Sequence, residues 1–168
     1  KRVIDVGGLV VAPGFVDLHT HAIRGIFQVP TADNYVRQGV TTIMEGPDGS
    51  SPIPLKPFLD KLAALPKSLN IGSFLGQGSV REAVIGLANR NATTDELDRM
   101  RAIVRDSMRD GAFGVSTRLF YGQANCTPPE EGVGPQKVVP PSCVVNYSTQ
   151  RTHRLACVTP TPEQQHSV

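Results

Sequence analysis

The sequence predicts an α/β fold built on a parallel sheet. Short apolar, β-branched runs alternate with runs whose apolar residues recur at helical spacing, from residue 15 to residue 117. Strands that alternate with helices in this way pair in parallel, with the helices as crossovers. The chain has 168 residues. A complete barrel of eight βα units needs about 250 residues, so this sequence can hold only part of such a barrel.

The first elements expected are three strands. Residues 3–6 and 9–12 flank a Gly-Gly turn, which favours two short strands joined tightly. Residues 15–21 follow a Pro-Gly turn and are apolar on both faces until their polar carboxyl end. That pattern is typical of a buried parallel strand whose end opens into a site.

The middle of the chain continues the alternation. Residues 31–38 predict a short helix that ends at Gly39, and residues 40–44 form a β-branched strand. The strand leads into a loop rich in Gly, Pro and Ser over residues 46–54. Residues 54–65 then carry leucines and a phenylalanine at helical spacing, which predicts a helix.

The next strand is predicted over residues 69–75. Thr93 and Glu96 have the spacing of a capping box, which predicts the start of a long helix that Gly111 closes. Residues 113–117 form the strand after that helix. Four strands are thus expected in the predicted parallel sheet, beginning with the one over residues 15–21.

The carboxyl-terminal composition differs from the rest of the chain. Residues 133–168 contain five prolines and a single acidic residue, and their apolar residues show no helical period. We expect no regular structure there.

Charge and cysteine content exclude several function classes. The 17 basic and 15 acidic residues are mixed along the chain, so we expect no nucleic-acid binding and no membrane docking. Glycine, proline and aspartate interrupt the apolar run over residues 3–16, which rules it out as a signal core or membrane span. Cys126, Cys143 and Cys157 form no CxxC pair and suit a reducing compartment. We therefore expect a cytoplasmic protein.

His19 and His21 are the strongest candidates for chemistry. They lie two residues apart on a predicted strand, so both side chains point to the same side. Imidazole nitrogens bind zinc at about 2.0–2.1 Å, and two on one rigid strand can reach a single ion. A lone His-x-His pair is more often two surface or hydrogen-bonded histidines. Its position at the end of an apolar strand favours the metal site here.

Several motifs resemble a known family. Residues 10–21, which read VVAPGFVDLHTH, resemble the opening signature of the amidohydrolase superfamily, and residues 39–42 resemble the start of its second strand. Residues 74–86 and 111–121 are similar to N-acyl-D-amino-acid deacylases, also called D-aminoacylases. The first two motifs specify only the superfamily, whereas the last two are more specific. The resemblance covers about residues 3–131.

This resemblance implies a partial metal-dependent hydrolase TIM barrel preceded by the edge of a small β-sandwich. Residues 1–13 would end the sandwich, and residues 14–131 would form the first βα units of the barrel, about four in number. Residues 132–168 would be an irregular tail, and their composition raises the hypothesis that they are read out of frame. Because the chain opens on Lys1 within a strand-like run, we expect a piece of a longer protein.

The resemblance also implies a reaction, a cofactor and site residues. The family cleaves the amide of a small-molecule N-acyl-D-amino acid with one or two divalent ions, normally zinc. His19 and His21 match its metal-binding histidines, and Asp48 falls where the family often places a metal-binding cysteine. A turn-forming role beside Gly49 is equally open for Asp48. Tyr121 matches a substrate-pocket tyrosine, although an ordinary packed aromatic explains it as well.

Departures from the family leave the catalytic residue unknown. Gln150 occupies the expected place of the next family histidine, and His153 lies three residues later. Neither the later histidine nor the acid–base aspartate of the family has a counterpart. A non-catalytic truncated or frame-disrupted fragment therefore stays open, as does an amidohydrolase of cyclic amides or isoaspartyl dipeptides. Open barrel edges would also favour self-association.

Overall fold

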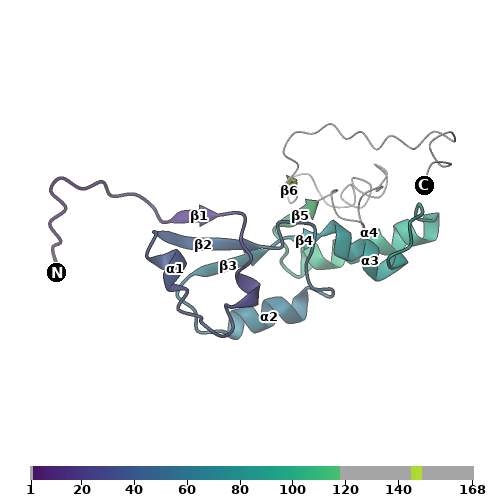
Figure 1. The fold of residues 1–168 in the computed structure, drawn as a ribbon, viewed down its shortest axis with the longest axis horizontal. Helices are drawn as coiled ribbons and strands as arrows, with labels where there is room; N and C mark the ends of the chain where they lie inside the picture. Colours follow the sequence, from purple (N-terminus) through teal and green to yellow (C-terminus); the bar gives the residue numbers. More distant parts are fainter. Residues whose placement is uncertain (1, 118–144, 149–168) are drawn as a thin grey trace, which may run out of the picture.

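The computed structural model describes residues 2–117 and 145–148, and all its strand pairs are parallel (Figure 1). One sheet has the order β1-β2-β3 and the other the order β4-β5-β6. The strands are β1 (Phe15–Asp17), β2 (Val40–Glu45), β3 (Asn70–Ser73), β4 (Leu75–Gly76), β5 (Gly114–Thr117) and β6 (Val145–Ser148). The predicted parallel α/β fold is confirmed.

The two sheets continue one another through Phe74, the single residue between β3 and β4. The backbone N–H of Phe74 donates to the carbonyl of Glu45 (2.9 Å), and the N–H of Phe113 donates to the carbonyl of Ser73 (3.0 Å). Neighbouring strands therefore follow one another in chain order from β1 to β6. This is the strand order of a βα barrel, in which the carboxyl ends of the strands carry the site.

The helices occupy the positions between the strands. They are the short η1 (Ala22–Arg24) and α1 (Asp33–Val36), followed by α2 (Lys56–Ala64), α3 (Gln77–Ile85) and α4 (Thr94–Arg109). Figure 1 shows α2 beside the first sheet, and α3 and α4 beside the second. The predicted capping box is confirmed: Glu96 N–H donates to Thr93 Oγ1 (3.3 Å), and Thr93 N–H donates to Glu96 Oε2 (2.8 Å).

The hydrophobic core lies where the helices pack on the strands. Burying such side chains is the main favourable contribution to folding. The buried residues include Ile43, Leu75 and Val115 from the strands, Leu55, Phe58 and Leu62 in or beside α2, and Met100 and Val104 from α4. These side chains pack the helices against β2, β4 and β5.

The two strands expected at the amino terminus are absent from residues 2–14, and that prediction is wrong. Figure 1 shows this segment leaving the body as an extended arm. Val3 and Val10 are 90% and 93% exposed. A two-stranded hairpin without a surface to bury its apolar side chains is marginal in water, and the described residues supply no such surface here. Only a turn remains, in which Leu9 N–H donates to the carbonyl of Val6 (2.9 Å).

Three further expectations need correction. The first barrel strand spans Phe15–Asp17 rather than residues 15–21, because the chain bends at Leu18 and His19. Helix α3 was not expected, since its Gly-Gln-Gly-Ser start is typical of a loop. Val145–Ser148 forms a strand parallel to β5 within the stretch expected to be irregular. Tyr121, Gln150, His153 and the three cysteines lie outside the described residues.

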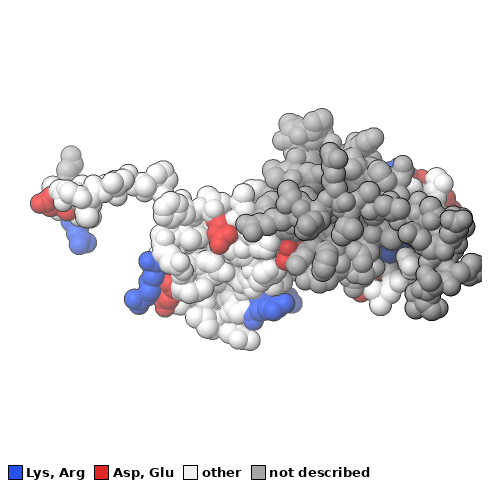
Figure 2. All heavy atoms as spheres, turned by 45° about the horizontal axis from the view of Figure 1, so that its top comes forward, with Lys and Arg blue, Asp and Glu red and all other residues white. Residues whose placement is uncertain are grey.

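The surface of the described residues carries charges of both signs. On the face in Figure 2, Lys and Arg side chains are scattered rather than gathered in one patch, and some of them lie beside acidic side chains. Within residues 2–117 and 145–148, no helix combines the length and the apolar character that crossing a bilayer requires.

Candidate metal centre and active site

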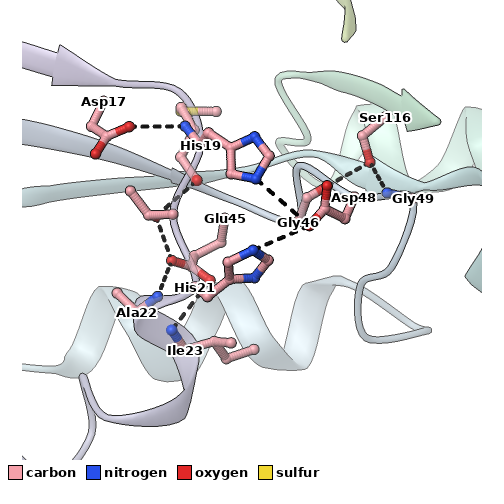
Figure 3. Close-up of polar contacts among 12 residues, drawn as sticks. Asp17, His19, His21, Ala22, Ile23, Glu45, Gly46, Asp48, Gly49 and Ser116 are labelled. Atoms are coloured by element: carbon pink, nitrogen blue, oxygen red, sulfur yellow. Dashed lines mark hydrogen bonds and ion pairs between the residues drawn. The ribbon is translucent and has the colours of Figure 1, made fainter. Parts of the chain in front are cut away.

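His19, His21 and Asp48 converge at the carboxyl ends of β1 and β2 (Figure 3). Oδ2 of Asp48 lies 3.1 Å from Nε2 of His21 and 3.6 Å from Nε2 of His19. The two imidazole rings meet edge to face, with centroids 5.5 Å apart. One ligand atom from each residue lies within 4.8 Å of the other two. The structure thus brings together all three residues that the sequence singled out as metal ligands.

The spacing of these atoms fits a small divalent ion. Zinc bonds to nitrogen and oxygen are about 2.0–2.2 Å long, so two ligand atoms of a tetrahedral ion lie about 3.3–3.5 Å apart. The two distances of 3.1 and 3.6 Å between imidazole nitrogens and the carboxylate bracket that spacing. The histidine side chains are 43% and 51% exposed, whereas that of Asp48 is 13% exposed. The donor set therefore faces solvent on one side, where a water and a substrate can approach.

Glu45 ends β2 directly behind this pair of histidines and is only 2% exposed. Its Oε1 accepts hydrogen bonds from the hydroxyl of Thr20 (2.6 Å) and the N–H of Ala22 (2.8 Å). Its Oε2 accepts from the N–H of Ile23 (3.2 Å). All three donors come from the segment that carries His21, so the carboxylate binds this segment to β2.

The loop that carries Asp48 is held by β5. The hydroxyl of Ser116 donates to the carbonyl of Gly46 and accepts from the N–H of Gly49 (3.0 Å) (Figure 3). This hydroxyl therefore bridges two residues on either side of Asp48. Gly46 and Gly49 have φ values of +72° and +71°. Glycine reaches this region at little cost, which permits the tight turn that presents Asp48.

The same loop lies tightly against the start of α3. The N–H of Gly76 donates to Oγ of Ser51 (2.9 Å), and the N–H of Ser51 donates to Oγ of Ser79 (2.9 Å). The N–H of Ser79 in turn donates to the carbonyl of Gly49 (3.2 Å). Asp48 is thus presented by a loop with hydrogen bonds to β4, α3 and β5.

A cleft of about 830 Å³ opens beside two of the candidate ligands, His21 and Asp48. It is lined mainly by η1, the loop after β2 and the start of α3, including His21, Arg24, Glu45, Asp48, Ser51, Phe58, Ser79 and Glu82. Among the described residues that line the cleft, Arg24 is the only lysine or arginine.

The carboxylate of Glu45 also affects Tyr35. Burial, together with the nearby charges of Glu45 and Asp17, raises the pKa of Tyr35 above its ordinary value.

Sequence reasoning missed Glu45, Arg24 and Ser116. Glu45 carries the same signal as His19 and His21, because it is a polar residue at the carboxyl end of an apolar strand. Arg24 and Ser116 have no such signal, since a single arginine or serine beside a strand is common. Tyr121 lies outside the described residues, so its pocket role stays a prediction.

Comparison with known proteins identifies the family to which the chain belongs. The model described as "Amidohydrolase family" matches residues 2–133. The chain belongs to the amidohydrolase family. The chain is 34% identical to the D-aminoacylase of Alcaligenes xylosoxydans xylosoxydans over 151 residues, which cover 76% of the chain and 31% of the relative. It is also 34% identical to the N-acyl-D-aspartate deacylase of the same organism over 152 residues, 77% of the chain and 30% of the relative.

Solved structures of relatives place the fold in the TIM-barrel superfamily. A crystal structure of D-aminoacylase, described as defining a novel subset of amidohydrolases, matches with a TM-score of 0.73 and 28% identity over 83% of this chain and 34% of that one. An N-acyl-D-glutamate deacylase from Bordetella bronchiseptica, complexed with zinc and a phosphonate inhibitor, matches in fold with a TM-score of 0.76 at 23% identity, over 83% and 34% of the chains. The chain spans about a third of the length of these relatives. The predicted partial barrel is confirmed.

Proposed function

We propose that this chain forms the metal-binding corner of a hydrolase that cleaves the amide bond of small-molecule N-acyl-D-amino acids, releasing a carboxylate and a D-amino acid. The observation that carries the proposal is the convergence of His19, His21 and Asp48 beside a cleft in a relative of D-aminoacylase. We also propose a cytoplasmic location, because three cysteines without a CxxC pair suit a reducing compartment.

His19, His21 and Asp48 would hold a zinc ion. A second divalent ion would bind nearby, because a solved D-aminoacylase structure is described as having a binuclear metal center. Zinc polarises an amide carbonyl and lowers the pKa of a bound water toward neutrality. The two histidines contribute neutral nitrogens, and Asp48 contributes a negative charge that offsets part of the charge of the ion. The group that moves the proton stays unassigned.

Arg24 favours a substrate that carries a carboxylate. Every N-acyl-amino acid carries an α-carboxylate, and Arg24 is the one Lys or Arg among the described residues that line the cleft. A guanidinium can bind a carboxylate through two parallel hydrogen bonds. A cyclic amide without a carboxylate gives Arg24 no partner, so the linear substrate is the better fit to this cleft.

Zinc titration of the full 168-residue chain tests the metal site. After removal of metal with a chelator, we expect the chain to bind zinc by calorimetry. His19→Ala, His21→Ala and Asp48→Ala should each weaken binding by at least about tenfold. Asp33→Ala is the matched control, because Asp33 is exposed on α1. Unchanged zinc content in His19→Ala would remove the metal-site interpretation.

Ligand binding to the zinc-loaded chain tests the substrate class. We expect N-acetyl-D-methionine to bind more tightly than its L enantiomer or hydantoin, as measured by NMR titration. Arg24→Met should weaken this binding, whereas Arg37→Met should not, because Arg37 is exposed at the end of α1. Preferential binding of hydantoin would instead support an amidohydrolase of cyclic amides. We expect no turnover by this chain alone, and turnover by purified monomer would overturn that expectation.

A further inference from the structure

Glu45 is a buried carboxylate that the proposed chemistry does not use. It lies at the carboxyl end of β2, is 2% exposed, and does not belong to the cluster of candidate metal ligands. Burying a carboxylate is costly unless hydrogen bonds replace its contacts with water. Three donors replace them here, and all three belong to the short segment around His21.

The position of His21 depends on the backbone, because its side chain is 51% exposed and packing holds little of the ring. Thr20 precedes His21. The backbone N–H and the hydroxyl of Thr20 lie 3.3 and 2.9 Å from the carbonyl oxygen of Met44. Ala22 and Ile23 follow it, and their N–H groups donate to Glu45. The backbone on both sides of His21 is therefore tied to the last two residues of β2.

We propose that Glu45 is a positioning residue for the metal centre, which aims His21 at Asp48 by holding Thr20, Ala22 and Ile23. This inference rests on the proposed function. Without the carboxylate, the N–H groups of Ala22 and Ile23 lose their acceptor, and the turn that carries His21 loses its connection to β2. The backbone then no longer holds His21 Nε2 and Asp48 Oδ2 at their distance of 3.1 Å in the metal-free protein.

Two pairs of variants test this role. Glu45→Ala removes the acceptor, and Glu45→Gln keeps the shape of the side chain but turns one acceptor into a donor that faces the N–H of Ile23 or Ala22. Thr20→Val removes the hydroxyl bound to Glu45, whereas Thr20→Ser keeps it. Val104→Ala is the control for stability, because Val104 is 1% exposed in α4, away from the cleft lining.

The readouts are zinc affinity by chelator competition, the visible spectrum of the cobalt-loaded chain, and urea unfolding of the metal-free chain. We expect Glu45→Ala to weaken zinc binding by about 10–100-fold, with Glu45→Gln in between. Thr20→Val should weaken it and Thr20→Ser should restore it. The cobalt spectrum should change with Glu45→Ala and Thr20→Val. Val104→Ala should lower stability with zinc affinity and the cobalt spectrum unchanged.

The outcomes separate this inference from the proposed function. If the unaltered chain binds no zinc, both fail. If it binds zinc and Glu45→Ala and Thr20→Val bind equally well, the positioning role alone fails. If zinc affinity falls in proportion to the free energy of unfolding in every variant, including Val104→Ala, then Glu45 has only a structural role. If Glu45→Ala does not fold, the comparison of Thr20→Val with Thr20→Ser decides.

Discussion

Gly76 is the point where an added methyl group should disturb the metal centre most directly. A Cβ at this position would lie 2.4 Å from the backbone carbon of Gly49 and 2.4 Å from the backbone nitrogen of Ser50. Carbon atoms in favourable contact are about 3.5–4.0 Å apart. Gly76→Ala must therefore push the loop away from β4 by about 1 Å. The φ of Gly76 is −79°, so the requirement for glycine is steric and not conformational.

The cost of that displacement has two parts. Forcing an extra methyl group into packed surroundings costs about 1–3 kcal/mol. Each hydrogen bond lost between the loop and its neighbours adds about 1 kcal/mol, and the bond from Gly76 N–H to Ser51 Oγ is the first affected. The free energy of unfolding should fall by about 2–4 kcal/mol, which lowers Tm by about 5–15 °C in a chain of this size.

Zinc affinity should fall as well, because the displaced loop carries Asp48. A movement of about 1 Å takes its carboxylate out of the spacing for a tetrahedral ion, and we expect about 10–100-fold weaker binding. Urea unfolding and calorimetric zinc titration measure the two effects. Gly25→Ala is the matched control, because a Cβ there meets nothing within 4 Å and φ is −133°. A Gly76→Ala chain as stable and as tight for zinc as Gly25→Ala would refute the reasoning.

Three further predictions follow from individual contacts. Asp48→Cys should keep zinc binding that Asp48→Ala loses, and a sulfur-to-metal absorption band in the cobalt-loaded chain would identify the new ligand. Hydrogen bonds from Arg90 lower the pKa of Glu96 from 4.5 to about 2, so its stabilisation is present above pH 4.5 and lost as the pH falls through 2. Urea titrations should show the stability gap between the unaltered chain and Glu96→Gln closing over that range, and a pH-independent gap would contradict this. The exposed apolar side chains of β1 should cause self-association, so light scattering on the purified chain should report species larger than a monomer.

The regular elements of the fold were largely predictable from the sequence because local rules decide them. The helix after Thr93 begins where the capping box indicates, and β2 forms where β-branched residues gather over residues 40–45. Helix α3 escaped prediction because its glycines serve the approach of the neighbouring loop at Gly49, a contact that no local pattern reveals.

The sequence predicted the candidate metal ligands, but the structure brings them together in a different way than the sequence suggested. His19 and His21 were expected to share one side of a strand, but β1 ends at Asp17, whose side chain accepts a hydrogen bond from the N–H of His19 (3.0 Å). The rings face Asp48 because the chain turns after β1 and is held there by Glu45. These contacts join residues far apart in the sequence. The sequence could therefore predict that the two histidines and Asp48 come together, but not that Glu45 holds the turn that brings them together.

The sequential order of the strands has a consequence for synthesis of the chain. Paired strands come from neighbouring parts of the sequence: Phe15 pairs with Val40, Thr42 with Asn70 and Leu75 with Val115. The entropic cost of closing the segments between paired strands grows only slowly with their length. His19, His21 and Asp48 all precede β3, so the three candidate ligands leave the ribosome well before Ser116 does. The candidate ligands are therefore synthesised before Ser116, whose hydroxyl holds the loop that carries Asp48.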